Sequence, residues 1–83
     1  MKVVWIYREY NDDLAYGDEY IKGFNRKEDA VALQKERLVE EYGTDDLEEI
    51  RKKVSNLWKI GDWITICNGN VFFYFCVEPL YIN

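Results

Sequence analysis

The sequence contains no histidine, and Ser55 is its one serine. Histidine is the commonest general base and zinc ligand, so its absence excludes a Cys-His nucleophile pair and the usual zinc sites. Two cysteines alone cannot supply the four ligands of a structural zinc ion. The five glycines are scattered, so no glycine-rich phosphate loop is present. We therefore expect no catalytic, cofactor-binding or metal-binding residues and a protein that is not an enzyme. Catalysis by carboxylates alone is the remaining alternative.

Long apolar runs are also missing from the chain. No segment approaches the length that spans a bilayer, and Met1-Lys2 leads into a β-rich stretch without an apolar signal region. Cys67 and Cys76 share a face of the hairpin proposed below. At about 3.3 Å per residue they lie roughly 20 Å apart, which is beyond disulfide reach. Free thiols are typical of the reducing cytoplasm, so we expect a cytoplasmic protein.

Acidic residues outnumber basic ones by 16 to 11, which gives a net charge of −5. Phosphate backbones repel so acidic a chain, so we expect no direct binding to nucleic acid. The charge suits either solubility or docking on a basic partner protein, and the sequence leaves both open. The length of 83 residues fits a single domain over 1–83, and 3 Trp, 7 Tyr and 4 Phe can make a small core dense.

The clearest pattern lies in the last third of the chain. Two β-rich runs, 63–67 and 71–77, flank Asn68-Gly69, which suits a two-residue type I′ turn because both of its central residues need φ > 0. This turn would place Cys67 opposite Asn70. Because side chains alternate along a strand, one face is wholly apolar and should join the core: Ile64, Ile66, Val71, Phe73, Phe75 and Val77. The other face is aromatic with polar edges: Trp63, Thr65, Cys67, Asn70, Phe72, Tyr74 and Cys76.

The first part of the chain predicts two more strands. Over 2–10, β-forming residues occupy both faces, as in a central strand that is buried on both sides. Residues 11–18 form a polar loop. Its acidic side chains could hold Ca²⁺ or Mg²⁺, but their spacing does not match an EF-hand, so we interpret the loop as a solvated turn. Residues 19–24 predict a short antiparallel return strand, in which Lys22 and Gly23 are typical of a sheet edge.

A first helix is expected to follow this return strand. Asn25 can cap it, Glu28 can complete a capping box, and Gly43 suits the left-handed residue after its end at Tyr42. Helical periodicity turns Leu33 away from the sheet. The same periodicity predicts a sheet-facing stripe of Val31, Leu38 and Tyr42, flanked by Ala30 and Val39.

A second helix is predicted next, with Asp45 as its cap and apolar residues recurring at helical spacing at Leu47, Ile50, Val54 and Leu57. Ser55-Asn56 should fray its end, and Gly61-Asp62 should form a turn before the hairpin. Pro79 has no N–H to donate and should interrupt the last strand. Residues 80–82 would then add a short edge strand.

This order of elements predicts an α+β fold. We expect a two-layer sandwich in which an antiparallel sheet of 3–5 strands carries two helices on one face, in the order β-β-α-α-β-β. The N-terminal strand should lie beside the C-terminal hairpin.

Two surfaces are candidates for partner binding. One is an acidic helical face that includes Asp29, Glu36 and Glu40, from which Leu33 would project as an apolar contact. It could equally be a solvated face with i,i+4 ion pairs. The other is the aromatic hairpin face, with Trp63, Phe72 and Tyr74. Aromatic platforms for bases normally sit among Lys and Arg, which are missing here, so this face suggests a protein interface or a homodimer. Alternatively, loops or the tail cover it.

The start of the chain resembles small uncharacterised acidic proteins of phages and Gram-positive mobile elements. The residues that carry the resemblance are Met1-Lys2-Val3-Val4-Trp5-Ile6-Tyr7, the acidic loop, and Gly23-Phe24-Asn25-Arg26-Lys27-Glu28-Asp29-Ala30. Such proteins open with a strand, pass an acidic loop and enter a helix through a Gly-aromatic segment. The second helix and the hairpin depart from their pattern. The resemblance implies a phage or mobile-element accessory protein, a group that includes anti-defence inhibitors such as anti-CRISPR proteins, and it brings no catalytic residues.

Together these observations favour a small non-enzymatic protein-binding domain. We expect an inhibitor or regulator that docks through its acidic surface on a basic host protein, one that could handle nucleic acid, in the host cytoplasm. The alternative is a homo-oligomeric structural or interaction module that uses the aromatic hairpin face.

Overall fold

The computed structural model describes residues 1–12 and 19–83. The predicted polar loop therefore lies mostly outside the described residues. Within these ranges the chain forms five strands and two helices. They are β1 (Lys2–Asn11), β2 (Glu19–Phe24), α1 (Lys27–Tyr42), α2 (Leu47–Arg51), β3 (Asn56–Ile60), β4 (Trp63–Asn68) and β5 (Val71–Ile82).

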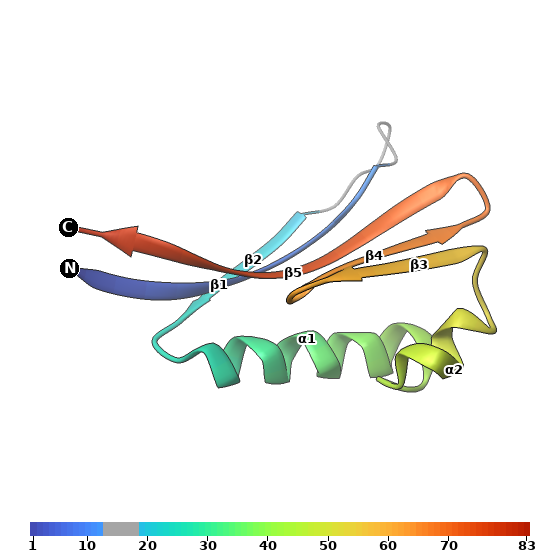
Figure 1. Ribbon diagram of the computed structural model, residues 1–83, viewed down its shortest axis with the longest axis horizontal. Coiled ribbons are helices and arrows are strands. Elements are labelled where there is room, and N and C mark those ends of the chain that lie inside the picture. The colour runs from blue at the N-terminus through green and yellow to red at the C-terminus, as the bar shows by residue number, and fades with distance from the viewer. Residues whose placement is uncertain (13–18) are drawn as a thin grey trace.

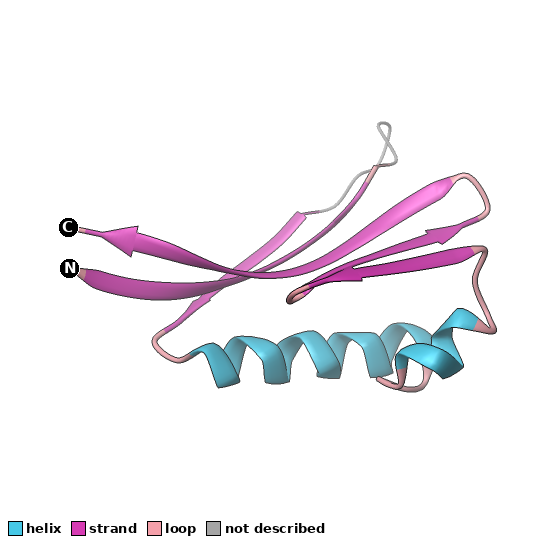
Figure 2. Ribbon diagram, in the orientation of Figure 1, coloured by secondary structure: helices cyan, strands magenta, loops and turns pink. Residues whose placement is uncertain are grey.

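The five strands make one antiparallel sheet in the order β2-β1-β5-β4-β3. Both helices lie on the same side of this sheet (Figure 1). The α+β class is therefore confirmed, and the sheet has the largest number of strands in the expected range. The N-terminal strand does lie beside the C-terminal hairpin, because β1 pairs with β5. The chain order is β-β-α-α-β-β-β, with one strand more than predicted (Figure 2).

The core lies between α1, α2 and the sheet. Tyr7, Phe75 and Ile66 fill its centre from three adjacent strands, and each is at most 1% exposed. Gln34 is the one buried polar side chain of the described ranges, and its amide nitrogen donates to the Asp62 carbonyl at 2.8 Å and the Phe75 carbonyl at 2.9 Å. This amide ties the middle of α1 to the sheet. The other buried apolar residues are Ala30, Leu38, Ile50, Leu57, Ile64, Cys76 and Val77.

The predicted hairpin forms, but its register differs by two residues. Asn68 pairs with Val71, so Gly69 and Asn70 make the turn instead of Asn68 and Gly69. Among the described residues only glycines have φ > 0, and Gly69 has φ 65°. A positive φ at the first central position alone is the type II′ pattern, not type I′. Because the shift is an even number of residues, the two predicted faces keep their members.

The second predicted helix is wrong beyond Arg51. Helix α2 ends there, and residues 56–60 instead form β3, an edge strand paired with β4. Leu57 fits both the helical and the strand periodicity. In the structure it is a strand residue that is 2% exposed and faces the core, while the next residue, Trp58, faces the other side of the sheet. The β-forming run from 57 to 60 outweighs the short helical pattern. The turn at Gly61-Asp62 is confirmed, and it joins β3 to β4.

Both predicted helix caps are misplaced by one residue. Arg26, not Asn25, is the N-cap of α1, and it makes no side-chain cap. Asp46, not Asp45, caps α2 and accepts from the Glu48 N–H at 3.0 Å. Gly43 ends α1 in the left-handed conformation, as predicted, with φ 79°.

The sheet-facing stripe of α1 is also rotated relative to the prediction. Ala30, Gln34 and Leu38 are its buried residues, and Val39 is 45% exposed. Leu33 was expected to face away, but it is half-buried and packs against the core.

Pro79 does not interrupt β5, which continues through it to Ile82. In an antiparallel strand the N–H groups of alternate residues point to the same side. The Val77 N–H points towards β4, where it donates to the Asp62 carbonyl at 3.2 Å. Pro79 is two residues after Val77, so an N–H at this position would also point away from β1. The first residue of β4, Trp63, pairs with Cys76, so β4 does not reach as far as Pro79 and this side of β5 is open there. On its other side, β5 pairs with β1 through Pro79 without interruption.

The hairpin register can be tested with two alanine substitutions. Gly69→Ala should lower the free energy of unfolding by about 1–2 kcal/mol, because alanine is strained at positive φ. Asn68→Ala should change it by less than about 0.5 kcal/mol, because Asn68 is an exposed strand residue here. Urea unfolding followed by circular dichroism measures both. Equal losses at the two positions would contradict the register.

Candidate protein-binding surfaces

The side of the sheet opposite the helices is called the far face below. The strand register and the alternation of side chains assign its members. Among the described residues, both helices lie on the other side of the sheet (Figure 1). The members of the far face are Lys2, Val4, Ile6, Arg8, Tyr10, Glu19, Ile21, Gly23, Asn56, Trp58, Ile60, Trp63, Thr65, Cys67, Phe72, Tyr74, Cys76, Glu78, Leu80 and Ile82.

Aromatic and aliphatic side chains dominate the far face. Trp58 stacks on Phe72 across the intervening strand, with ring centroids 6.1 Å apart, and Tyr10 stacks on Tyr74 at 4.5 Å. Ile60 is 81% exposed and Ile21 57% exposed, at opposite edges of the sheet. The apolar surface therefore extends from β2 to β3, well beyond the predicted hairpin.

Both cysteines are free thiols on the far face, as expected. Cys76 is fully buried, and burial raises the pKa of its thiol to about 12. A thiol with so high a pKa holds little thiolate at neutral pH, so it is a poor nucleophile.

Three of the four charged side chains of the far face are paired with one another. Arg8 on β1 lies with its Nε 3.4 Å from a carboxylate oxygen of Glu19 and its Nη1 3.9 Å from one of Glu78. The guanidinium also lies over the Tyr10 ring, 4.6 Å from its centroid. A hydrogen bond with Tyr10, together with the nearby carboxylates, raises the pKa of Arg8. With Lys2 added, the basic and acidic residues of this face balance.

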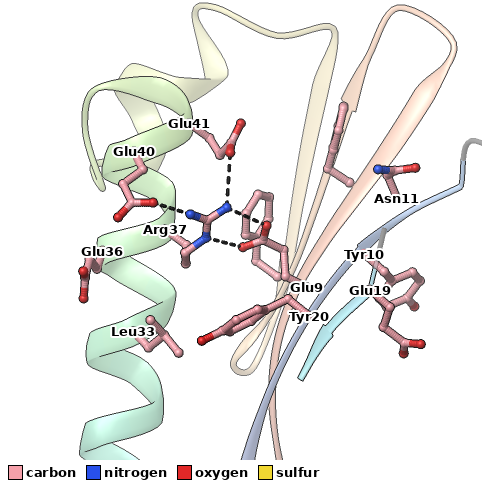
Figure 3. Close-up of a pocket in the computed structure, with 12 residues that line it drawn as sticks. Glu9, Tyr10, Asn11, Glu19, Tyr20, Leu33, Glu36, Arg37, Glu40 and Glu41 are labelled. Atoms are coloured by element: carbon pink, nitrogen blue, oxygen red, sulfur yellow. Dashed lines mark hydrogen bonds and ion pairs between the residues drawn. The ribbon is translucent and has the colours of Figure 1, made fainter. Parts of the chain in front are cut away.

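The second candidate surface is an acidic groove beside α1. An open cavity of about 690 Å³ lies between α1 and strands β1 and β2 (Figure 3). Leu33, Glu36 and Glu40 line it from the helix, and Tyr20 lines it from β2. A smaller cavity of about 320 Å³ shares Leu33 and Glu36 with it and adds Asp29. The two cavities together form the acidic groove.

Arg37 closes the floor of the acidic groove. Its Nε and Nη2 donate to the two carboxylate oxygens of Glu9 at 2.9 and 3.0 Å, and it also pairs with Glu40 and Glu41 (Figure 3). The Tyr7 hydroxyl donates to Glu9 at 2.6 Å from inside the core. This bidentate pair fixes α1 to β1.

The titration of these groups follows from their partners. Burial on its own would raise the pKa of Glu9, but hydrogen bonds from Arg37 and Tyr7 and the Arg37 charge lower it overall. The hydrogen bond to Glu9 raises the pKa of Arg37. Burial, and then the hydrogen bond to Glu9, raise the pKa of Tyr7. The whole network therefore keeps one charge state at neutral pH, which suits a structural clamp.

The predicted partner-binding residues separate into two groups on opposite sides of the molecule. Asp29, Leu33, Glu36 and Glu40 line the acidic groove. The predicted hairpin residues, Trp63, Phe72 and Tyr74, lie on the far face. Sequence reasoning missed the contribution of β3 to the far face, because residues 56–60 were interpreted as the end of a helix. It also missed Arg37, although a basic residue one turn before two glutamates was a visible signal.

Comparisons with protein-family models, with curated proteins and with solved structures find no match to this chain. In the described ranges, no helix is both long and apolar enough to cross a membrane. The same ranges hold no group of three or more metal-ligating side chains. The predicted polar-loop residues Asp13 and Asp18 lie outside these ranges, while Asp12 accepts from the Phe72 N–H at 2.7 Å.

The clamp between α1 and β1 can be tested with Arg37→Gln. This change leaves the half-buried Glu9 without its cation and should cost about 1–3 kcal/mol at pH 7. Arg26→Gln is the matched control, because its pair with Glu28 is exposed, and should cost less than about 0.5 kcal/mol.

The pH dependence of this cost has a definite sign. Because the pKa of Glu9 is lowered in the folded state, its pairing stabilises the protein fully above the ordinary carboxyl pKa of about 4.3. That contribution is lost as the pH falls through the lowered pKa. The difference between wild type and Arg37→Gln in urea unfolding should therefore shrink at acidic pH. A difference that grows on acidification would contradict the clamp.

Proposed function

We propose that this chain is a small non-enzymatic protein-binding module and that the far face is its working surface. The observation that carries the proposal is the exposure of large apolar side chains over a sheet face that no described element covers. An antiparallel sheet that faces water on one side normally alternates apolar and polar residues. The far face departs from that pattern on every strand.

The energy of this exposure favours a bound partner. Full burial of an isoleucine stabilises a complex by about 1.5–3 kcal/mol. Ile60 and Ile21 are both more than half exposed, and Trp58 is 43% exposed. Contiguous exposed apolar patches of this kind mark interaction sites in soluble proteins. Tryptophan is also enriched among the residues that dominate binding energy.

The charges of the far face support a protein partner over a nucleic acid. Stacking platforms for bases combine aromatic rings with free Lys and Arg side chains. Here Arg8 is held by Glu19 and Glu78. The apolar surface therefore lacks the positive field that a phosphate backbone needs.

The acidic groove supports a second candidate function, the docking of a basic segment of a host protein. Its lining combines glutamates with Leu33 and Tyr20, a suitable environment for the ammonium group and the aliphatic stem of a lysine. The role of a phage or mobile-element inhibitor, which the resemblance implies, is compatible with either surface. The proposal itself rests on the far face.

The experiment is affinity capture with a panel of surface variants. A tagged chain is incubated with a lysate of cells that also express an untagged copy, and bound proteins are identified by mass spectrometry. We expect Ile60→Arg to lose the bound protein, because a charge on an apolar interface is desolvated without a partner. Glu36→Gln with Glu40→Gln should retain it. High salt should not release it, since the contact is apolar.

The opposite pattern would assign binding to the acidic groove. If the Glu36→Gln, Glu40→Gln variant loses the bound protein, if high salt releases it, and if Ile60→Arg keeps it, then the far face is not the working surface. Val39→Arg serves as the control for both, because Val39 is exposed on α1 and lines neither surface.

A further inference from the structure

We infer that the occupant of the far face is a second copy of this chain. In this arrangement two sheets pack far face to far face about a two-fold axis, and the helices form the two outer layers. The inference rests on the proposed function and names its partner. Four features of the molecule support it: its charge distribution, two obstructed stretches of strand edge on the β3 side of the sheet, the size of the far face and the position of β5.

The first support is the distribution of charge. The chain has a net charge of −5, so two copies repel each other wherever their acidic surfaces meet. On the far face, Lys2 and Arg8 balance Glu19 and Glu78, and Arg8 pairs with both glutamates. Face-to-face packing therefore places two neutral surfaces in contact. It also keeps the helix α1 glutamates of the acidic groove on the outer side of each copy.

The second support is that the β3 edge is partly closed to another strand, at Leu57. The outward N–H of Leu57 donates to Asn56 Oδ1 at 2.8 Å, and its carbonyl accepts from Arg51 Nη1 at 2.7 Å. Both groups would otherwise be free to pair with a neighbouring strand. A partner that adds a strand here would have to displace two hydrogen bonds. The accessible apolar surface next to this edge is instead the far face, through Trp58 and Ile60.

After Cys76, β5 extends past the end of its pairing with β4, and the exposed edge of this segment is obstructed in a different way. Pro79 occupies the position whose N–H would point outwards, so the edge lacks a donor there. Strand addition is therefore disfavoured at both of these edges. A docked sheet face needs no free backbone groups, and it remains compatible with all five strands as described.

The third support is the size of the far face. Strands lie about 4.8 Å apart and rise about 3.3 Å per residue, so five strands of 5–12 residues give a face on the order of 600 Å². Two such faces bury about 1,200 Å², which reaches the lower end of stable protein interfaces. Two aligned sheets pack about 10 Å apart in a sandwich, with their side chains interdigitated.

The fourth support is the central position of β5 in the sheet. Strand β5 has two strands on each side of it. If the two-fold axis lies between the packed sheets and passes over their centre, β5 of one copy packs over β5 of the other. Tyr74 of β5 and Thr65, its cross-strand neighbour on β4, then lie near the axis. Thr65 is small and partly exposed, so a large charged residue there blocks the approach of the second copy.

Analytical ultracentrifugation of the purified chain tests the inference. We expect the wild type to sediment at twice the 10.0 kDa mass of the chain at concentrations of about 100 μM, with association that added NaCl does not weaken. Thr65→Arg should raise the dissociation constant at least about 100-fold, because it brings two like charges together near the axis. Val39→Arg, which adds the same side chain on the outer surface of α1, should leave the constant unchanged.

Ile60→Arg provides a second disrupting variant with little risk to the fold, since this side chain is 81% exposed. Circular dichroism confirms that each variant is folded. A wild type that stays monomeric up to about 1 mM overturns the inference. So does a dimer that survives both Thr65→Arg and Ile60→Arg. If the chain is monomeric but captures a different protein through Ile60, the proposed function stands and only the identity of the partner changes.

Discussion

The structure depends on one constraint: its sheet has two faces, and the helices of residues 1–12 and 19–83 cover only one of them. Strand β5 lies in the middle and contributes to both sides, with Phe75 in the core and Tyr74 on the far face. Helix α1 is held on its side by two polar contacts, the Gln34 amide to the sheet and the Arg37 pair with Glu9. These contacts fix which face the helices cover, and they leave the far face without a helix from the described residues.

Much of the fold could be predicted from local patterns. Period-two alternation identified the hairpin and both of its faces correctly, because an even shift of register does not move a side chain across the sheet. The register itself was wrong, since Gly69 can serve in either of two adjacent turns and only the paired strands decide between them. The end of the second helix was wrong for a related reason. Leu57 satisfies the helical and the strand period alike, and its pairing with Ile66 across β3 and β4 is a long-range contact that no local pattern contains.

The candidate surfaces were harder to predict than the elements. The sequence indicated an acidic helical face and an aromatic hairpin face, and both exist. Their placement on opposite sides of the molecule depends on where α1 packs, which the stripe of apolar residues indicated only approximately. The interpretation of Leu33 as a projecting contact failed because Gln34, a polar residue, takes a buried position and rotates the helix. A buried amide of this kind is invisible to hydrophobic periodicity, since its two acceptors, in the β3–β4 turn and in β5, are distant in the sequence.

The partly closed edge of β3 has a consequence for the behaviour of the protein at high concentration. A sheet this rich in aromatic residues carries a risk of fibril growth, in which each added chain extends the ladder of the one before. Arg51 and Asn56 occupy the backbone groups of Leu57 at the point where such a ladder would begin on this side of the sheet. Association through a sheet face, in contrast, is complete once the two faces have met. The molecule can therefore expose an apolar sheet face while being protected, at this edge, from open-ended assembly.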